Sequence, residues 1–504
     1  MIESGKCFCF NCYQEFDITD VYFKLTVNIK PDSVKSNSEV STKKSTKGSL
    51  SEDDISGGGR NLSLDNENSS ILPKPQEKIV YFRMDGDNLI VDPSISDKDI
   101  EVSLAPTKKD QNGYYHEVHV DYRIKGKNEV KNAVVNSRCC PCCNKDGKKQ
   151  LHPITESMGF CDWYIILMFG DTYSGKTAYL RTILELSEGN FEKNKDICKQ
   201  ICGYSIQSEK TEEHEITNAN LPRRSSDKKK DLFAYFKLIN DITNKEVMFF
   251  FKDNPGEEME YKKEDTEFRT DLLKFSHYVD AVMFFSDVFS MSGMVKNVNR
   301  FGIDSEKIKN SIYGDPAVGN IKKQFNKGDV IKFLRRLQIL NNNSNVSALY
   351  VVSMTDVLKR LINREYGGEV PFDFSCDYQS DNLDEKLERC DVLLSTKSVI
   401  FRDVIHRRNF RYKQYFDCAL ETYYFLKKED IFFDSFLNWV RENDYNLGVT
   451  AVASNLDDYN QVRRITEPFA WLIQCLINGK KFNMPLLDQI GYYYQEYKTE
   501  QLEG

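Results

Sequence analysis

Uninterrupted apolar runs alternate with stretches of helical periodicity in the sequence beyond residue 160. Strands are predicted at Tyr164–Phe169, Leu232–Ile239, Val247–Phe251, Ala281–Phe285, Ala348–Val352 and Gly448–Ala453. Helices are predicted at Lys176–Glu188, Asp329–Leu340, Asp430–Arg441 and Pro468–Ile477. Short apolar strands that alternate with helices are typical of an α/β sheet with crossover connections. We therefore predict an α/β domain over residues 156–504, a sheet flanked by helices, with a helical insertion at about 365–428.

The first 155 residues follow a different pattern, in which apolar and polar positions alternate as in half-buried strands. Such strands are predicted at Val21–Ile29, Ile79–Met84, Asn88–Asp92 and Tyr115–Lys125. Residues 31–76 contain eleven serines and no aromatic residue, so they cannot bury enough apolar surface to offset the entropy of ordering. The pattern predicts a small β-module over residues 1–155 with a disordered insert at about 31–76.

Composition and charge restrict the classes of function. The 504 residues carry a formal net charge of −8, and 40% of them are apolar, which indicates a globular protein without the general basic field that favours nucleic acid. No apolar run approaches the ~20 residues of a membrane-spanning helix. The opening residues MIESGKCFCF lack the pattern of a secretory leader. We therefore expect a cytoplasmic protein without a membrane span, and nucleic acid is an improbable partner.

The fourteen cysteines are placed unevenly, and two clusters have the spacing of metal knuckles. Cys9 and Cys12 form the first pair, and Cys140 and Cys143 can form the second. Pairs of thiolates two residues apart hold Zn²⁺ from two sides in structural sites. A second register has the same spacing, because Cys139 and Cys142 are also separated by two residues. We prefer Cys140 with Cys143, since the sequence C-P-x-C is the usual form of a knuckle.

The most specific motif follows the first apolar strand of the α/β region and precedes a helix. It fits the pattern G-x-x-x-x-G-K-[ST] throughout, which is the phosphate-binding loop of nucleoside-triphosphate-binding proteins. Backbone N–H groups of such a loop bind phosphates, the lysine neutralises phosphate oxygens, and the hydroxyl of the last residue binds Mg²⁺. The predicted nucleotide-binding residues are Gly170, Asp171, Thr172, Tyr173, Ser174, Gly175, Lys176 and Thr177.

A second motif, Asp253-Asn-Pro-Gly256-Glu257, leaves the strand predicted at Val247–Phe251. An aspartate at the end of a buried strand is a typical Mg²⁺ ligand in phosphate-loop proteins. Gly256 has the D-x-x-G spacing at which a glycine amide reaches the γ-phosphate. Glu257 occupies the position of the water-orienting residue, so we assign it and Lys176 as candidate catalytic residues. A Pro-Gly turn capped by Asp253 is the structural alternative.

A base-reading residue is predicted after the strand Ala348–Val352. Asp356 has the place of the aspartate that accepts two guanine N–H bonds, whereas Met354 stands where a lysine is usual. The carboxylate favours GTP, and the methionine leaves an ATPase as an alternative. A further alternative is that the segment merely caps a following helix.

Taken in order, these motifs resemble the bacterial double-GTPase-like proteins of the TRAFAC clade. The residues that carry the resemblance are Cys9, Cys12, Cys140, Cys143, Gly170–Thr177, Leu221-Pro222, Asp253–Gly256, Asp356 and Arg464–Trp471. The resemblance implies a zinc ribbon ahead of a phosphate-loop GTPase-like domain, and a role in bacterial defence or regulation.

From these motifs we expect a protein that binds GTP, Mg²⁺ and Zn²⁺. It would hydrolyse GTP slowly and signal to a protein partner. A scaffold that binds nucleotide without hydrolysing it is the alternative from another class of function.

Overall fold

The computed structural model describes the chain in segments. The chain divides into two compact units. The described residues are 1–10, 12–29, 76–142, 151–170, 174–187, 204–208, 232–253, 276–287, 291, 327–341, 346–353, 426–427, 430–452, 454, 465 and 467–479. Apart from residues 76 and 426–427, the insertions expected at 31–76 and 365–428 lie outside them. One unit consists of Met1–Ile18 with Cys140–Gly504, and the other of Thr19–Cys139.

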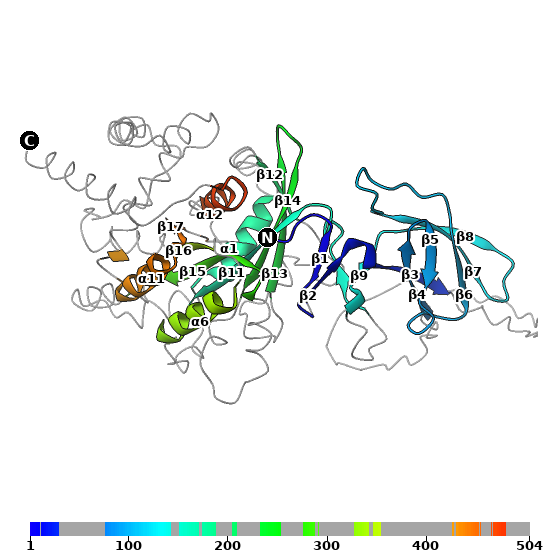
Figure 1. Cartoon of the computed structure of the whole chain (residues 1–504), viewed down its shortest axis with the longest axis horizontal. Helices are drawn as coiled ribbons and strands as arrows, with labels where there is room; N and C mark the ends of the chain where they lie inside the picture. The colour runs from blue at the N-terminus through cyan, green and yellow to red at the C-terminus, as the bar shows by residue number, and fades with distance from the viewer. Residues whose placement is uncertain are drawn as a thin grey trace, which may run out of the picture. The chain divides into compact units, whose positions relative to one another are not determined.

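In its described residues, the larger unit is built on a mixed sheet of seven strands (Figure 1). Their order in space is β12-β13-β14-β11-β15-β16-β17. Their bounds are Tyr204–Ser208 (β12), Leu232–Asn240 (β13), Glu246–Asp253 (β14), Asp162–Gly170 (β11), Val279–Asp287 (β15), Ser347–Ser353 (β16) and Asn446–Ala451 (β17). The five strands from β14 to β17 run parallel. All six predicted strands are present, which confirms the α/β class.

Two strands at one edge depart from a simple pattern of crossovers. β13 pairs with β14 antiparallel, and β12 pairs with β13 antiparallel. A short turn at residues 241–245 joins β13 to β14, and a turn of that length can only reverse the chain. β12 was not predicted, because its sequence YSIQS lacks a continuous apolar run.

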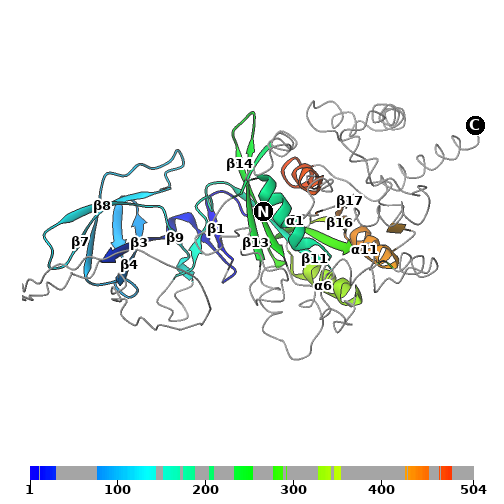
Figure 2. The same ribbon diagram turned by 180° about the vertical axis from the view of Figure 1, so that it is seen from behind.

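Helices cover both faces of this sheet (Figures 1 and 2). One apolar cluster joins β11, β13 and β14 to α1 (Lys176–Ser187) and α12 (Glu467–Leu472). The π-helical turn η7 (Ile473–Ile477) continues α12 and also contributes to this cluster. α6 (Lys327–Leu340) and α11 (Ile431–Glu442) cover the opposite face. There, Phe169 of β11 packs near Phe333, and Phe284 of β15 near Phe432.

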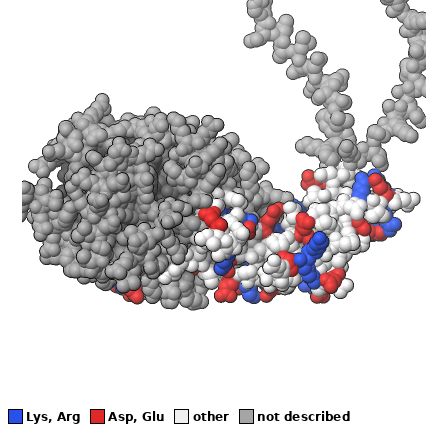
Figure 3. All heavy atoms as spheres, turned by 90° about the horizontal axis from the view of Figure 1, so that it is seen from above, with Lys and Arg blue, Asp and Glu red and all other residues white. Residues whose placement is uncertain are grey.

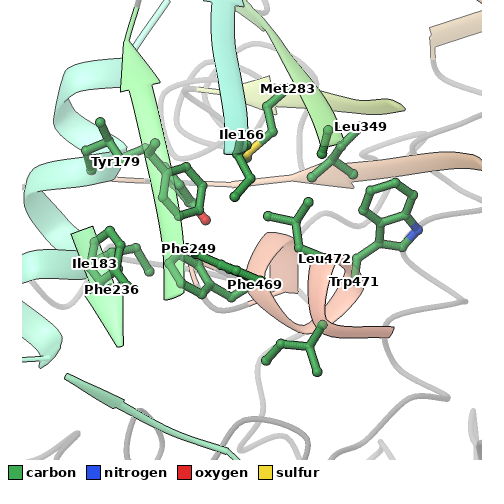
Figure 4. Packing of buried hydrophobic residues seen from close by; sticks show 14 of the residues in the cluster. Ile166, Tyr179, Ile183, Phe236, Phe249, Met283, Leu349, Phe469, Trp471 and Leu472 are labelled. Carbon is green, nitrogen blue, oxygen red and sulfur yellow. The ribbon is translucent and has the colours of Figure 1, made fainter. Parts of the chain in front are cut away.

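The cluster beneath α1 and α12 is rich in aromatic rings (Figure 4). Phe469 of α12 lies 5.1 Å from Phe236 and 5.1 Å from Phe251, measured between ring centroids. Trp471 lies against β17 at Gly448, where a Cβ atom would be 2.4 Å from the indole. The helix therefore docks where β17 has no side chain.

The N-terminal segment belongs to the larger unit, although it precedes the other unit in sequence. β1 (Lys6–Cys9) and β2 (Gln14–Asp17) form an antiparallel hairpin. Ile2 forms an antiparallel bridge with Trp163 of β11, with N···O distances of 3.0 and 2.9 Å. A short strand, β10 (Pro153–Ile154), precedes β11.

The smaller unit, Thr19–Cys139, is composed of β-strands, as the alternating pattern predicts. One group of paired strands has the order β9-β3-β4-β5, and a second sheet has the order β6-β7-β8. The bounds are Tyr22–Ile29 (β3), Gln76–Asp85 (β4), Asn88–Val91 (β5), Ile100–Leu104 (β6), Val118–Ile124 (β7), Val130–Val135 (β8) and Arg138–Cys139 (β9). One apolar cluster, from Phe23 to Val135, joins the two sheets. Every described member of this core belongs to the smaller unit.

Candidate functional site

Gly170 is the last residue of β11, where the central strand passes into the predicted phosphate loop. Its φ angle is 151°, and a Cβ atom at this position would lie 2.1 Å from the carbonyl oxygen of Phe285 in β15. Only glycine lets the two backbones approach so closely. Asp171, Thr172 and Tyr173 lie outside the described residues.

The C-terminal half of the loop leads directly into α1. Gly175 has a φ of +81°, and its carbonyl oxygen accepts a hydrogen bond of 2.8 Å from the N–H of Tyr179. The buried Lys176 ammonium donates to the carbonyl oxygen of Gly170 at 3.0 Å and to Oγ of Ser174 at 3.2 Å. Lys176 thus contacts both the first residue of the loop, Gly170, and Ser174 near its other end.

Thr177 and Asp253 come together although they are 76 positions apart. The Thr177 hydroxyl donates a hydrogen bond of 2.8 Å to Oδ2 of Asp253. Asp253 is the last residue of β14 and is only 1% exposed. A hydroxyl beside a carboxylate offers the oxygen ligands that Mg²⁺ prefers. The arrangement therefore fits the metal expected at this position.

Other parallel strands end near the same loop. A Cβ atom on Gly175 would lie 3.6 Å from Cβ of Ser353, the last residue of β16, and 3.9 Å from Oγ of Ser454, which follows β17. Ligands of open α/β sheets bind at such carboxyl ends. The sequence analysis did not single out Ser353 or Ser454. Gly256, Glu257 and Asp356 lie outside the described residues, so their predicted roles stay predictions.

The sulfur atoms of Cys9, Cys12 and Cys140 form a second cluster in the larger unit. All three lie within 4.8 Å of one another, and those of Cys12 and Cys140 are 3.6 Å apart. Two thiolates on a tetrahedral Zn²⁺ lie about 3.8 Å apart, given Zn–S bonds of ~2.3 Å. The cluster therefore has the dimensions of a zinc site. Cys143, the fourth predicted ligand, lies outside the described residues.

Local backbone contacts shape both sides of this cysteine cluster. The N–H of Tyr13 donates to the carbonyl oxygen of Cys9 at 2.8 Å and closes the turn that carries Cys9 and Cys12. The N–H of Cys142 points to Sγ of Cys140 at 3.3 Å. An N–H donor at a thiolate favours the charged form that binds metal. Among the described cysteines, Cys140 and not Cys139 or Cys142 contributes the third sulfur of the group.

Comparisons with known proteins give little further information. No family model matches the chain. No curated protein matches it either. Among solved structures, a bacterial selenocysteine-specific elongation factor, EF-Sec, aligns with 42% of this chain at 12% identity and a TM-score of 0.14. The alignment covers 29% of the elongation factor. A likeness of this size carries no argument about fold or function.

Surface charge and helix length are the features to compare with the expectations about nucleic acid and membranes. On the face drawn in Figure 3, acidic and basic side chains of the described residues are interspersed. Within the described segments, every helix is too short or too polar to cross a bilayer.

Proposed function

We propose that the larger unit binds GTP with Mg²⁺ at the loop Gly170–Thr177, hydrolyses it slowly and signals to a protein partner. The observation that carries the proposal is the convergence of Lys176, Thr177 and Asp253 at the end of the central strand. Residues with these functional groups, in this order and on these elements, are what phosphoryl transfer requires.

The chain's own groups have distinct roles in this proposal. The Lys176 ammonium binds the β- and γ-phosphate oxygens, and the backbone N–H groups around Gly175 orient them. Thr177 and Asp253 would hold Mg²⁺, which would supply positive charge to the phosphates when bound. Glu257 orients water, the Gly256 amide contacts the γ-phosphate, and the Asp356 carboxylate accepts hydrogen bonds from guanine. We further propose that Cys9, Cys12 and Cys140, together with Cys143, hold one structural Zn²⁺.

The first experiment is a titration of the purified protein with fluorescent GTP and ATP, in Mg²⁺ and again in EDTA. We expect GTP to bind more tightly than ATP, because an aspartate can accept from two guanine N–H groups and adenine lacks that pair. Equal affinities would refute the guanine preference. Single-turnover phosphate release then distinguishes a hydrolase from a scaffold that only binds nucleotide.

Replacement of the loop lysine tests the site itself. Lys176→Ala should weaken triphosphate binding by at least about tenfold, or ~1.4 kcal/mol, because it removes the charge-assisted phosphate contact. Lys245→Ala is the matched control, since Lys245 is exposed and pairs with Asp162 at the opposite end of β11. An affinity that changes by less than about threefold, or ~0.65 kcal/mol, in Lys176→Ala would contradict the assignment.

A further inference from the structure

The turn between Cys9 and Cys12 is packed onto the central sheet of the same unit. The ring of Phe10 stacks on Phe250 of β14, with centroids 3.6 Å apart and planes inclined by 19°. Phe10 also lies 6.0 Å from Trp163 of β11 and 5.7 Å from Tyr235 of β13. The cysteine turn is therefore held against the strand that ends at Asp253.

Tyr13, which follows the turn, contacts a buried charge on β14. The Lys252 ammonium donates a hydrogen bond of 3.3 Å to the hydroxyl of Tyr13 and lies 5.3 Å from the centre of its ring. Lys252 is only 1% exposed. A buried ammonium is costly unless polar or aromatic groups surround it, so the position of Tyr13 affects that of Lys252.

Lys252 and Asp253 are neighbours on β14 and point to opposite faces of the sheet. Successive side chains of a strand alternate between faces, so Lys252 faces Tyr13 while Asp253 faces Thr177 on α1. The two residues are the last of the strand. A change in how Lys252 is held will therefore shift the backbone that presents the Asp253 carboxylate.

We propose that Tyr13 and Lys252 are positioning residues that couple metal binding at the cysteine cluster to Mg²⁺ binding at Thr177 and Asp253. A metal fixes the turn from Cys9 to Cys12, the turn fixes Tyr13, and Tyr13 holds Lys252 and the end of β14. By linkage the coupling is reciprocal, so bound Mg²⁺–nucleotide also tightens metal binding by the cysteines. This inference rests on the proposed function.

The test is the Mg²⁺ dependence of GTP binding in full-length variants, with the zinc content of each variant measured by elemental analysis. Tyr13→Phe keeps the ring and removes the hydroxyl, and Lys252→Met keeps most of the length of the side chain and removes the charge. Each should weaken the apparent Mg²⁺ affinity by about fivefold or more, the lower end of typical coupling. Zinc content and GTP binding in EDTA should not change.

The matched control is Tyr22→Phe, which removes a hydroxyl that bonds to Asp92 in the smaller unit. This variant should leave the Mg²⁺ dependence unchanged. A purely structural role for Tyr13 and Lys252 would lower thermal stability without a shift in Mg²⁺ dependence. As a reciprocal measurement, saturating GTP and Mg²⁺ should slow the transfer of zinc to a chelator in the wild type, and by less in Tyr13→Phe.

The outcomes are separable. If the wild type binds no nucleotide, the proposed function fails and this inference fails with it. If it binds nucleotide but both variants retain the wild-type Mg²⁺ dependence, only this inference is overturned. Loss of zinc from both variants also overturns it, because the two residues would then hold the cysteine turn rather than Asp253.

Discussion

Tyr179 shows how a single buried hydroxyl affects stability beside the phosphate loop. Its ring lies in the apolar cluster beneath α1 (Figure 4). The centroids of the Tyr179 and Phe285 rings are 5.4 Å apart. Among the described residues its hydroxyl has no hydrogen-bond partner. Burial raises the pKa of this phenol well above its usual value of 10.0. The native state therefore favours the neutral phenol and gains nothing from the hydroxyl.

We predict that Tyr179→Phe is neutral or stabilising at pH 7, by up to about 1–2 kcal/mol, since it removes a desolvated polar group. Above pH 10 the wild type should lose stability faster than the variant. The unfolded phenol releases its proton there and the buried one does not, so the difference in slope approaches ~1.4 kcal/mol per pH unit. Urea unfolding at a series of pH values measures both effects. Destabilisation at pH 7 by the variant would show that the hydroxyl has a partner.

Cys9 and Cys12 supply two of the proposed zinc ligands, so their removal should release the metal. Cys9→Ser combined with Cys12→Ser should release about one Zn²⁺ per chain, the stoichiometry of one closed thiolate site. Because structural metal binding is coupled to folding, the variant should also be more susceptible to proteolysis around residues 1–18. Elemental analysis and limited proteolysis measure these effects. Wild-type protein that contains no zinc would refute the assignment.

At the scale of elements, α12 depends on a strand position without a side chain. A Cβ atom on Gly448 would lie 2.4 Å from Cε2 of Trp471 and 2.6 Å from Cδ1 of Leu349. We predict that Gly448→Ala destabilises the larger unit by about 1–3 kcal/mol, the usual cost of overpacking. Thermal or urea unfolding measures this cost. Trp471→Phe in the same chain should recover part of the loss, and strictly additive effects would contradict the contact.

Strands and helices of the α/β region could be predicted from sequence because they are buried on one or both faces. Tyr164–Phe169 and Val247–Phe251 are continuous apolar runs, and the observed strands extend them by no more than two residues at either end. Strand direction could not be predicted in this way, since the apolar run of β13 reads the same for either direction. β8 was missed because most of its residues are exposed and its apolar pattern is weak.

The candidate site was predictable to the extent that its residues are local in sequence. The motif at Gly170–Thr177 is contiguous in the sequence, and Asp253 is the last residue of a strand with a continuous apolar run. The contact of Tyr13 with Lys252 joins residues 239 positions apart and leaves no local pattern. Its only sequence signal is a lysine within the apolar run VMFFFK of β14, a position where charge is unusual unless it is paired.

At the scale of the whole molecule, the smaller unit is an insertion between the two halves of the cysteine cluster. Cys12 and Cys140 are 128 positions apart, and Thr19–Cys139 lies between them. The described members of its apolar cluster all belong to this unit. Its two ends meet, because Tyr22 of β3 is paired with Cys139 of β9. The long separation of the metal ligands is therefore compatible with one compact metal site.

We predict that replacing residues 20–138 with a short Gly-Ser linker leaves one zinc per chain and nucleotide affinity within about twofold, or ~0.4 kcal/mol, of the wild type. The reason is that the cysteine cluster, the phosphate loop and their supporting strands all belong to the larger unit. Elemental analysis and the GTP titration measure the result. Loss of zinc from a variant that remains folded would show that the insertion takes part in the site.

This insertion also fixes the order in which the metal site can be completed during synthesis. At roughly 5–20 residues per second, Cys140 leaves the ribosome about 6–26 s after Cys12. During that interval the first cysteine pair has neither its third ligand nor β11 to pack against. If the insertion folds first, the pairing of Tyr22 with Cys139 shortens the loop between Cys12 and Cys140 from 128 residues to about 12. The entropic cost of closing this loop then falls by about 2 kcal/mol. Folding of the smaller unit would thus bring Cys140 close to Cys9 and Cys12 before the metal site is complete.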